Sequence, residues 1–223
     1  MPVVLTAPYG SDGELLWVIA PLVNESGVSQ VDELSLTDQL AYQVTQVNGL
    51  AALPLNRTIE AMRVLGIGRI DTPEKARAVA RTLGADAIVV GSITAWDPYD
   101  PPTLGLNLTL LPVSGAMLAP GFADPDPRAM QGATTDTEGP ASGPRQASAV
   151  AEHLDASSHE VQALIQRYAS GRTEDQSALA WRGYTKSMKL FQEFACFRTV
   201  ERLLDAESRR VASANSQQTV SAR

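Results

Sequence analysis

The pattern of apolar and polar positions is most regular between Asp71 and Pro112. Apolar residues recur at helical spacing from Ala76 to Leu83, which predicts a helix with one buried face. Thr72 is placed to cap the N-terminus of this helix, and Gly84 follows its last turn, where a left-handed C-cap residue belongs. The segment therefore begins with a well-delimited amphipathic helix.

Two strands are predicted after this helix. The run from Ala87 to Ile93 is apolar and rich in β-branched residues, which is typical of a strand buried on both faces. From Leu104 to Leu110 every second residue is leucine and the residues between are small or polar, so this strand should bury one face. The intervening segment contains two Asp-Pro pairs, beginning at Asp97 and Asp100, which favour a structured turn.

The first 65 residues predict two further strands and two helices. The apolar run from Leu16 to Val23 predicts a strand, and Pro21 within it favours a position at a sheet edge or at the end of the strand. An apolar stripe from Leu36 to Val47 predicts a helix. A short strand from Leu50 to Leu55 and a helix from Asn56, as its cap, to Leu65 complete this part. The predicted inward-facing residues of the second helix are Ile59, Met62 and Leu65.

The predicted order of elements is β-α-β-α-α-β-β. This order indicates an α/β (α+β) sandwich, in which helices cover a small mixed sheet. We assign residues 16–114 to this domain and interpret residues 1–15 as a flexible leader.

The composition changes after this domain. Residues 115–147 are rich in Gly, Pro, Ala, Asp, Thr and Ser and show no helical or strand period. Such a segment cannot bury enough apolar area to offset the entropy of ordering it, so we predict a disordered insertion. Residues 148–212 predict a helical module, and residues 213–223 a frayed tail.

The C-terminal module is predicted to contain two helices. Ser157 and Glu160 fit a capping box at the start of the first. The second is a long helix from Glu174 to Val211 with two adjacent aromatic stripes. An isolated helix needs no such stripes, so the long helix should pack on the sheet domain, on another subunit or on a partner. The candidate interaction surface consists of Trp181, Tyr184, Met188, Phe191, Phe194 and Phe197.

Composition narrows the classes of function. The formal net charge is −7, so the chain lacks the excess of basic residues that is typical of nucleic-acid-binding proteins. No apolar run approaches the about 20 residues of a membrane-spanning helix. Cys196 is the single cysteine, which excludes an intrachain disulfide and disfavours a cysteine-based metal site. We therefore predict no nucleic-acid partner, no membrane span in this chain, no metal and no cofactor.

Few residues are placed to carry chemistry. His153 and His159 have no convergent set of ligands nearby, so we expect both on the surface. Cys196 lies between aromatic positions of the long helix and is interpreted as a small buried hydrophobic residue. No nucleophile–base pair is evident, and we predict that the chain is not an enzyme. The carboxylates interpreted as turn and loop residues rather than as a cation site are Asp86, Asp97 and Asp100.

Short motifs in the central segment resemble a bacterial envelope family. The motifs are Leu65-Gly66, then Ala80-x-x-Leu83-Gly84-Ala85-Asp86, then the strand Val89-Val90-Gly91-Ser92. They are similar to motifs of the fold shared by lipoprotein activators of penicillin-binding proteins (LpoB-like), the curli secretion channel protein CsgG and the N-terminal domain of TolB. The resemblance covers about residues 16–114 and implies the same fold.

The resemblance also implies a function and a location. It implies a non-enzymatic cell-envelope protein, in the periplasm or at the outer membrane, that docks another envelope protein or a second copy of itself. The start of the sequence shows neither a signal peptide nor a lipobox cysteine, so a cytoplasmic protein is expected if Met1 is the true start. The alternative function is a cytoplasmic small-ligand-binding or regulatory domain, with a pocket near residues 97–100.

Overall fold

The computed structural model describes residues 3–9, 13–115, 117, 147–170, 172 and 180–221. The predicted insertion at 115–147 lies almost entirely outside the described residues, as does the predicted start of the long helix at Glu174. The strands are β1 (Leu15–Ile19), β2 (Val23–Asn24), β3 (Leu50–Ala52), β4 (Ala87–Asp97), β5 (Thr103–Pro112) and β6 (Ser148–Asp155). The helices are α1 (Glu33–Thr45), α2 (Leu55–Val64), α3 (Pro73–Thr82), α5 (His159–Ala169), the 3-10 helix η1 (Ala180–Thr185) and α6 (Met188–Ser221).

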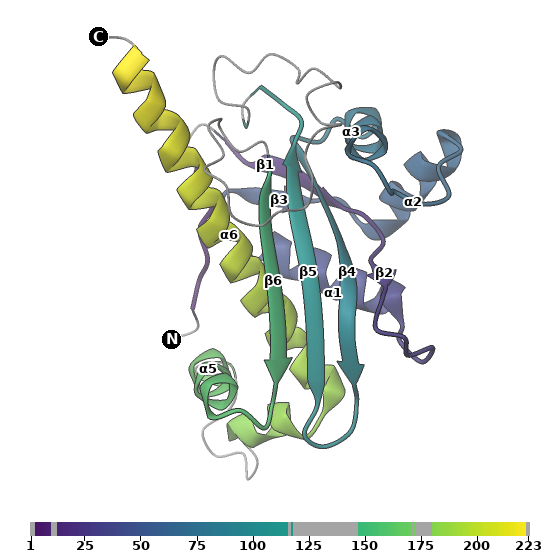
Figure 1. The fold of residues 1–223 in the computed structure, drawn as a ribbon, viewed down its shortest axis with the longest axis vertical. Coiled ribbons are helices and arrows are strands. Elements are labelled where there is room, and N and C mark those ends of the chain that lie inside the picture. Colours follow the sequence, from purple (N-terminus) through teal and green to yellow (C-terminus); the bar gives the residue numbers. More distant parts are fainter. Residues whose placement is uncertain are drawn as a thin grey trace, which may run out of the picture.

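The strands form one six-stranded mixed sheet (Figure 1). Their order is β3-β1-β4-β5-β6, and β2 pairs with β4 beyond the end of β1. β1 runs parallel to β3 and β4, whereas β5 is antiparallel to β4 and β6. The long β4–β5 hairpin is the centre of the sheet, with Ala87 opposite Pro112 and Asp97 opposite Thr103. The fold is the predicted mixed α/β sandwich.

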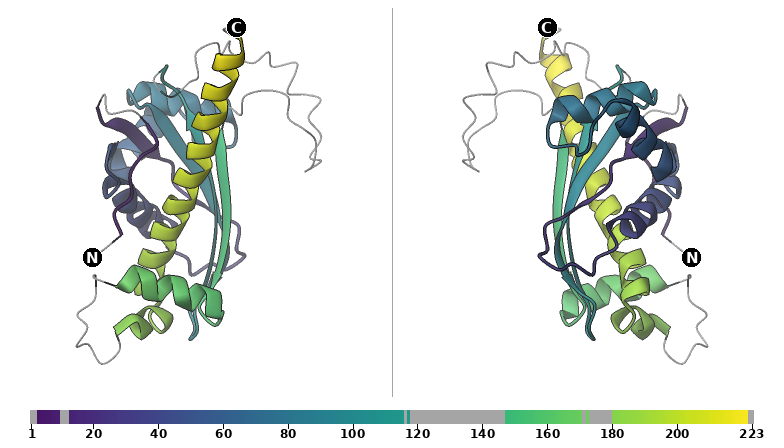
Figure 2. Two further views of the ribbon diagram at one scale, coloured as in Figure 1. Left: turned by 90° about the vertical axis from the view of Figure 1, so that its left-hand side faces the viewer. Right: turned by 90° about the vertical axis from the view of Figure 1, so that its right-hand side faces the viewer.

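Helices cover both faces of this sheet (Figure 2). α1, α5 and α6 contribute to the larger core on one face, and α2 and α3 pack on the other. Neighbouring residues of β4 contribute to the two layers in turn, because Ile88 packs in the α2/α3 core and Val89 in the α1/α6 core. The four alternating leucines of β5 lie in the larger core, as their alternation predicted. They are Leu104, Leu106, Leu108 and Leu110.

Local signals around the central segment are confirmed. The Thr72 side chain accepts a hydrogen bond from the backbone N–H of Lys75 at 3.3 Å and caps α3. Gly84 follows this helix with a φ of +66°, the left-handed conformation predicted for it. In the β4–β5 turn, Asp97 accepts a hydrogen bond from the N–H of Tyr99 at 3.0 Å. This turn has the structured form that its Asp-Pro pairs predict.

Two N-terminal elements differ from the prediction. The apolar run at 16–23 is not one strand, because Pro21 lacks an N–H group and the ladder is interrupted between Ile19 and Val23. α2 begins at Leu55 instead of at Asn56, with Pro54 as its N-cap. The buried face also differs from the prediction, because Ile59 and Leu65 are 39% and 40% exposed. The buried residues of α2 are Leu55, Thr58, Ala61 and Met62.

The segment at 148–155 is a strand, β6, that the sequence did not predict. It pairs with β5 from Ser148 opposite Leu110 to Asp155 opposite Thr103. Its inward positions include Val150 and Leu154, but the alanines on either side of Val150 give little strand signal. Residues 148–155 and α6 therefore belong to the same sheet and core as residues 15–112.

The ends of the C-terminal helices also differ from the prediction. The capping box at Ser157 is absent, since Ser158 is the N-cap of α5 and makes no side-chain capping bond. The N–H of Ser157 instead donates to Asp155 at 2.7 Å, which closes a turn after β6. α6 begins at Met188, after η1, and continues to Ser221, past the predicted end at Val211.

Gly91 in β4 has no room for a side chain. A Cβ atom at this position would collide with the backbone oxygen of Asn107 and lie 2.6 Å from a methyl carbon of Leu108, both on β5. We expect Gly91→Ala to destabilise the fold by about 1–3 kcal/mol, measured by urea denaturation. Gly68→Ala is the matched control, because a Cβ there meets no atom within 4 Å. Equal stability of the two variants would show that β5 can move away from β4 without cost.

Candidate binding groove

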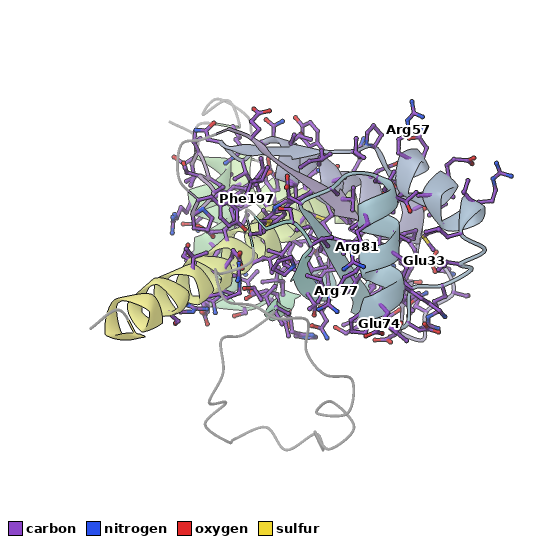
Figure 3. All side chains as sticks on the ribbon, turned by 90° about the horizontal axis from the view of Figure 1, so that it is seen from above. Glu33, Arg57, Glu74, Arg77, Arg81 and Phe197 are labelled. Carbon is purple, nitrogen blue, oxygen red and sulfur yellow. The ribbon has the colours of Figure 1, made fainter. Side chains whose placement is uncertain are left out.

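The six residues of the predicted interaction surface are mostly internal. Tyr184 and Phe197 are each 7% exposed, and Phe191 and Phe194 are buried completely or nearly so. Figure 3 shows Phe197 on the α6 side of the molecule, away from Arg77 and Arg81 of α3. The aromatic stripes thus pack within the molecule, which is one of the three outcomes left open. Binding through the two partly exposed members, Trp181 and Met188, stays a prediction.

The other candidate residues singled out from the sequence have surroundings that fit a structural role. His153 and His159 are exposed, as predicted. Cys196 is fully buried, and this burial raises the pKa of its thiol. Asp86 accepts a hydrogen bond from the N–H of Leu16 at 2.8 Å and so ties β4 to β1. Within the described residues, no group of three or more His, Cys, Asp or Glu side chains is placed to hold a metal ion.

The structure has an open groove of about 550 Å³ on the α1/α6 side. Its walls come from segments far apart in the sequence: the leader, α1, the end of α5, η1 and α6. The lining is mixed, with aromatic rings, amide groups and both signs of charge. The lining residues are Val3, Val4, Leu5, Gln39, Tyr42, Gln43, Gln46, Tyr168, Arg172, Tyr184, Glu193 and Phe197.

One wall of the groove is the leader, which is fixed at three points. Arg172 donates to the carbonyl oxygen of Val3 at 3.2 Å. Asn48 exchanges two backbone hydrogen bonds of 2.9 Å with the leader, to the oxygen of Leu5 and from the N–H of Ala7. Tyr9 donates its hydroxyl to Glu207 at 2.8 Å. The described part of the predicted flexible leader is therefore held against the domain.

A second wall is a row of glutamines on α1 and at its C-cap. Gln39, Gln43 and Gln46 follow each other at helical spacing, beside the apolar stripe that packs in the core. Gln43 is only 6% exposed, yet its side-chain amide has no hydrogen-bond partner among the described residues. The hydroxyls of Tyr168 and Tyr184, which line the groove from α5 and η1, likewise make no hydrogen bond within the described chain. Unpaired donors and acceptors therefore face the groove from two sides.

These glutamines are not predicted by the apolar pattern of α1, which marks only the residues that pack in the core. The signal was present, since Gln39, Gln43 and Gln46 recur at the i, i+4 and i+7 spacing of a helix face. A polar stripe beside an apolar stripe is also typical of ordinary solvation, so the spacing alone does not indicate a site. What distinguishes Gln43 from an ordinary solvated residue is its low exposure in a groove lined by segments distant in sequence. Only the three-dimensional structure shows this.

A buried charged network fixes α6 and the leader above the groove. Glu207 is fully buried and accepts two hydrogen bonds from the Arg210 guanidinium, at 2.7 and 2.6 Å. Its carboxylate also accepts from Ser148 of β6 at 2.7 Å and from Tyr9 of the leader at 2.8 Å. Arg210 donates further to the carbonyl oxygen of Met117 at 2.9 Å. Three segments of the chain, α6, β6 and the leader, meet at this one carboxylate, and Arg210 links a fourth at Met117.

The network holds Glu207 in its charged form. Burial opposes ionisation, but the hydrogen bonds from Arg210 and Ser148 and the charge of Arg210 outweigh it, so the pKa of Glu207 lies below its usual value. Burial and the nearby Glu207 carboxylate raise the pKa of the Tyr9 phenol, which stays protonated and donates. The hydrogen bond from Tyr9 to Glu207 is thus charge-assisted, because its acceptor is an ionised carboxylate.

We expect Arg210→Met to cost about 3–5 kcal/mol of unfolding free energy, because it leaves a buried carboxylate without its counter-charge. The double variant Glu207→Met/Arg210→Met should be more stable than Arg210→Met alone, since it removes both charges. Urea denaturation of the two variants measures the difference. As a control, Arg63→Met breaks a solvent-exposed pair with Glu60 and should change the stability far less than Arg210→Met. A double variant less stable than Arg210→Met would contradict this interpretation.

The lowered pKa of Glu207 also predicts a pH dependence. The stability it contributes is complete above its unfolded pKa of about 4.3 and is lost as the pH falls through the lower folded value. Glu207→Gln should therefore be less stable than the wild type at neutral pH and lose less stability on acidification. Urea midpoints at about pH 7 and about pH 3 test this. Parallel pH curves for the two proteins would show that Glu207 ionises alike in both states.

Comparison with known proteins gives only distant structural likenesses. No protein-family model matches the chain, and no curated protein matches it in sequence. The LpoB C-terminal domain from Salmonella enterica is similar over 48% of this chain and 78% of that one, with 17% identity and a TM-score of 0.39. The hypothetical protein CT253 from Chlamydia trachomatis is similar over 87% and 98%, with 10% identity and a TM-score of 0.41. PelC from Paraburkholderia phytofirmans, solved as a dodecamer, is similar over 49% and 68%, with 16% identity and a TM-score of 0.30.

These likenesses concern the course of the backbone and carry no statement about activity. LpoB, which the sequence motifs resemble, is among the similar structures, whereas the resemblance to CsgG and to TolB stays a prediction. Among the helices in the described ranges, none is both long enough and apolar enough to cross a membrane.

Proposed function

We propose that this chain is a non-enzymatic binding module of the bacterial cell envelope, which docks another envelope protein by taking a segment of that protein into the groove. The proposal rests on Gln43, a residue only 6% exposed whose amide lines the groove and makes no hydrogen bond to the described chain. The amide atoms are not among the fully buried unpaired groups of the described chain, so a group bound in the groove can reach them and form the missing hydrogen bonds.

The chemistry of the groove favours a polypeptide segment. A glutamine amide offers one acceptor and two donors, which match the N–H and C=O groups of a peptide backbone.

The groove also offers apolar contact at its rim. Val4 is 61% exposed and Tyr42 is 56% exposed, and they face the groove from the leader and from α1. Exposed apolar side chains around a polar centre are typical of surfaces that bind other proteins. A partner segment would cover both while its backbone meets the glutamines.

The envelope location rests on the motif resemblance around residues 65–92 and is proposed with it. The alternative, a cytoplasmic regulatory domain with a pocket near residues 97–100, has less support. Asp97 and Asp100 are engaged in the turn, by the N–H of Tyr99 and by an ion pair of 3.2 Å with Lys186. These contacts explain the two carboxylates without a ligand.

A site-specific photo-crosslinker in place of Tyr42, in the native cells, tests the proposal. Tyr42 is at the groove, and we expect it to give a covalent adduct with one defined envelope protein. The matched control is the same crosslinker in place of Tyr99, which is 74% exposed at the β4–β5 turn and should give none. Adding Gln43→Leu should reduce the Tyr42 adduct at least severalfold, since the buried amide is lost.

Two results would contradict the proposal. One is equal crosslinking from Tyr42 and Tyr99, which would remove the groove as the site of docking. The other is recovery of the intact protein with the cytoplasmic fraction, which would favour the regulatory-domain alternative.

A further inference from the structure

The two charged side chains that line the groove differ in whether they have partners within the chain. Arg172 is engaged, because its guanidinium donates to the backbone oxygens of Tyr168 and Val3 at 3.1 and 3.2 Å. Glu193 of α6 lines the same groove and is half-buried, but has no ion-pair or hydrogen-bond partner among the described residues. One carboxylate in the groove is thus unpaired.

The other glutamates of α6 show that pairing is the rule on this helix. Glu201 pairs with Arg198 at 2.6 Å and with Arg167 at 3.4 Å. Glu207 is bound by Arg210. Glu193 is the remaining glutamate of α6, and it is the one that faces the groove. A half-buried carboxylate gains when a cation approaches it, because the surrounding protein screens the charge less than water does.

Aromatic rings share the groove with Glu193. Tyr168, Tyr184 and Phe197 line the groove together with it. Arg172 shows that such rings accept a guanidinium, since its central carbon lies 4.3 Å from the ring centre of Tyr168 and 4.9 Å from that of Phe197. The remaining ring, that of Tyr184, is in contact with Tyr168 at 5.6 Å between ring centres.

We propose that the groove selects a partner segment that carries an arginine or lysine side chain, which Glu193 receives, while the glutamines of α1 bind its backbone. This inference rests on the proposed function and adds the chemistry of the partner. The two kinds of contact are separate, since neutral amides recognise any polypeptide and the single carboxylate distinguishes a basic side chain from an acidic one. An acidic side chain beside Glu193 would meet a like charge and be disfavoured there.

The test uses the full chain and three capped pentapeptides, Thr-Val-X-Val-Thr with X as Arg, Gln or Glu. Binding is followed by NMR through the side-chain amide signal of Gln43. The Arg peptide should bind about fivefold more tightly than the Gln peptide, the range of a partly exposed ion pair, and the Glu peptide more weakly than either. Glu193→Gln should remove this order and leave the affinity for the Gln peptide unchanged. Glu160→Gln, the same change at an exposed residue of α5 outside the groove, should keep the order.

The outcomes separate this inference from the proposed function. Equal affinity for the three peptides would overturn the inference and leave the groove as a polypeptide site. An order of affinities that persists in Glu193→Gln would also overturn it, because the selectivity would come from elsewhere. Absence of any shift of the Gln43 amide with all three peptides would overturn both proposals.

Discussion

The packing of α6 against α1 and strands β5 and β6 is the contact on which the rest of the structure depends. α6 contributes Phe191 and Phe194 to the core at its beginning and Glu207 to the charged network farther along. Because α1 and α6 lie on the same face of the sheet, the space beside their line of contact is bounded on two sides. The leader and the end of α5 close it further, and the groove results from this arrangement.

The same helix, α1, serves the core with one face and the groove with the next. Leu36, Leu40 and Val44 are almost fully buried in the core. Gln39 and Gln43, which directly precede two of them in the sequence, line the groove. A rotation of α1 large enough to move the glutamines would expose those apolar residues. The position of the polar groups is therefore stabilised by hydrophobic packing, which keeps an unpaired amide where solvent or a partner can reach it.

Much of the fold follows from local signals in the sequence. The cap at Thr72, the left-handed Gly84 and the leucine alternation of β5 are determined within a few residues, and the structure has all of them. β6 and the start of α6 follow from tertiary contacts instead. A segment with little strand signal becomes a strand because the free edge of β5 lies beside it, and Gln43 becomes part of a site because the leader and the end of α5 line the same groove. Interactions of this kind cannot be inferred from periodicity, which describes one element at a time.

The hydrogen bond between Tyr9 and Glu207 joins residues 198 positions apart in the sequence. During synthesis, Tyr9 leaves the ribosome long before Glu207 is added to the chain. β6 is likewise made before α6, the helix that packs against it. The leader can therefore reach its final place only when nearly the whole chain has been made. Contacts of such long range are formed late, because a large loop must close before they are gained. The wall of the groove is thus among the last parts of the protein to assemble, and a chain that ends before α6 would lack it.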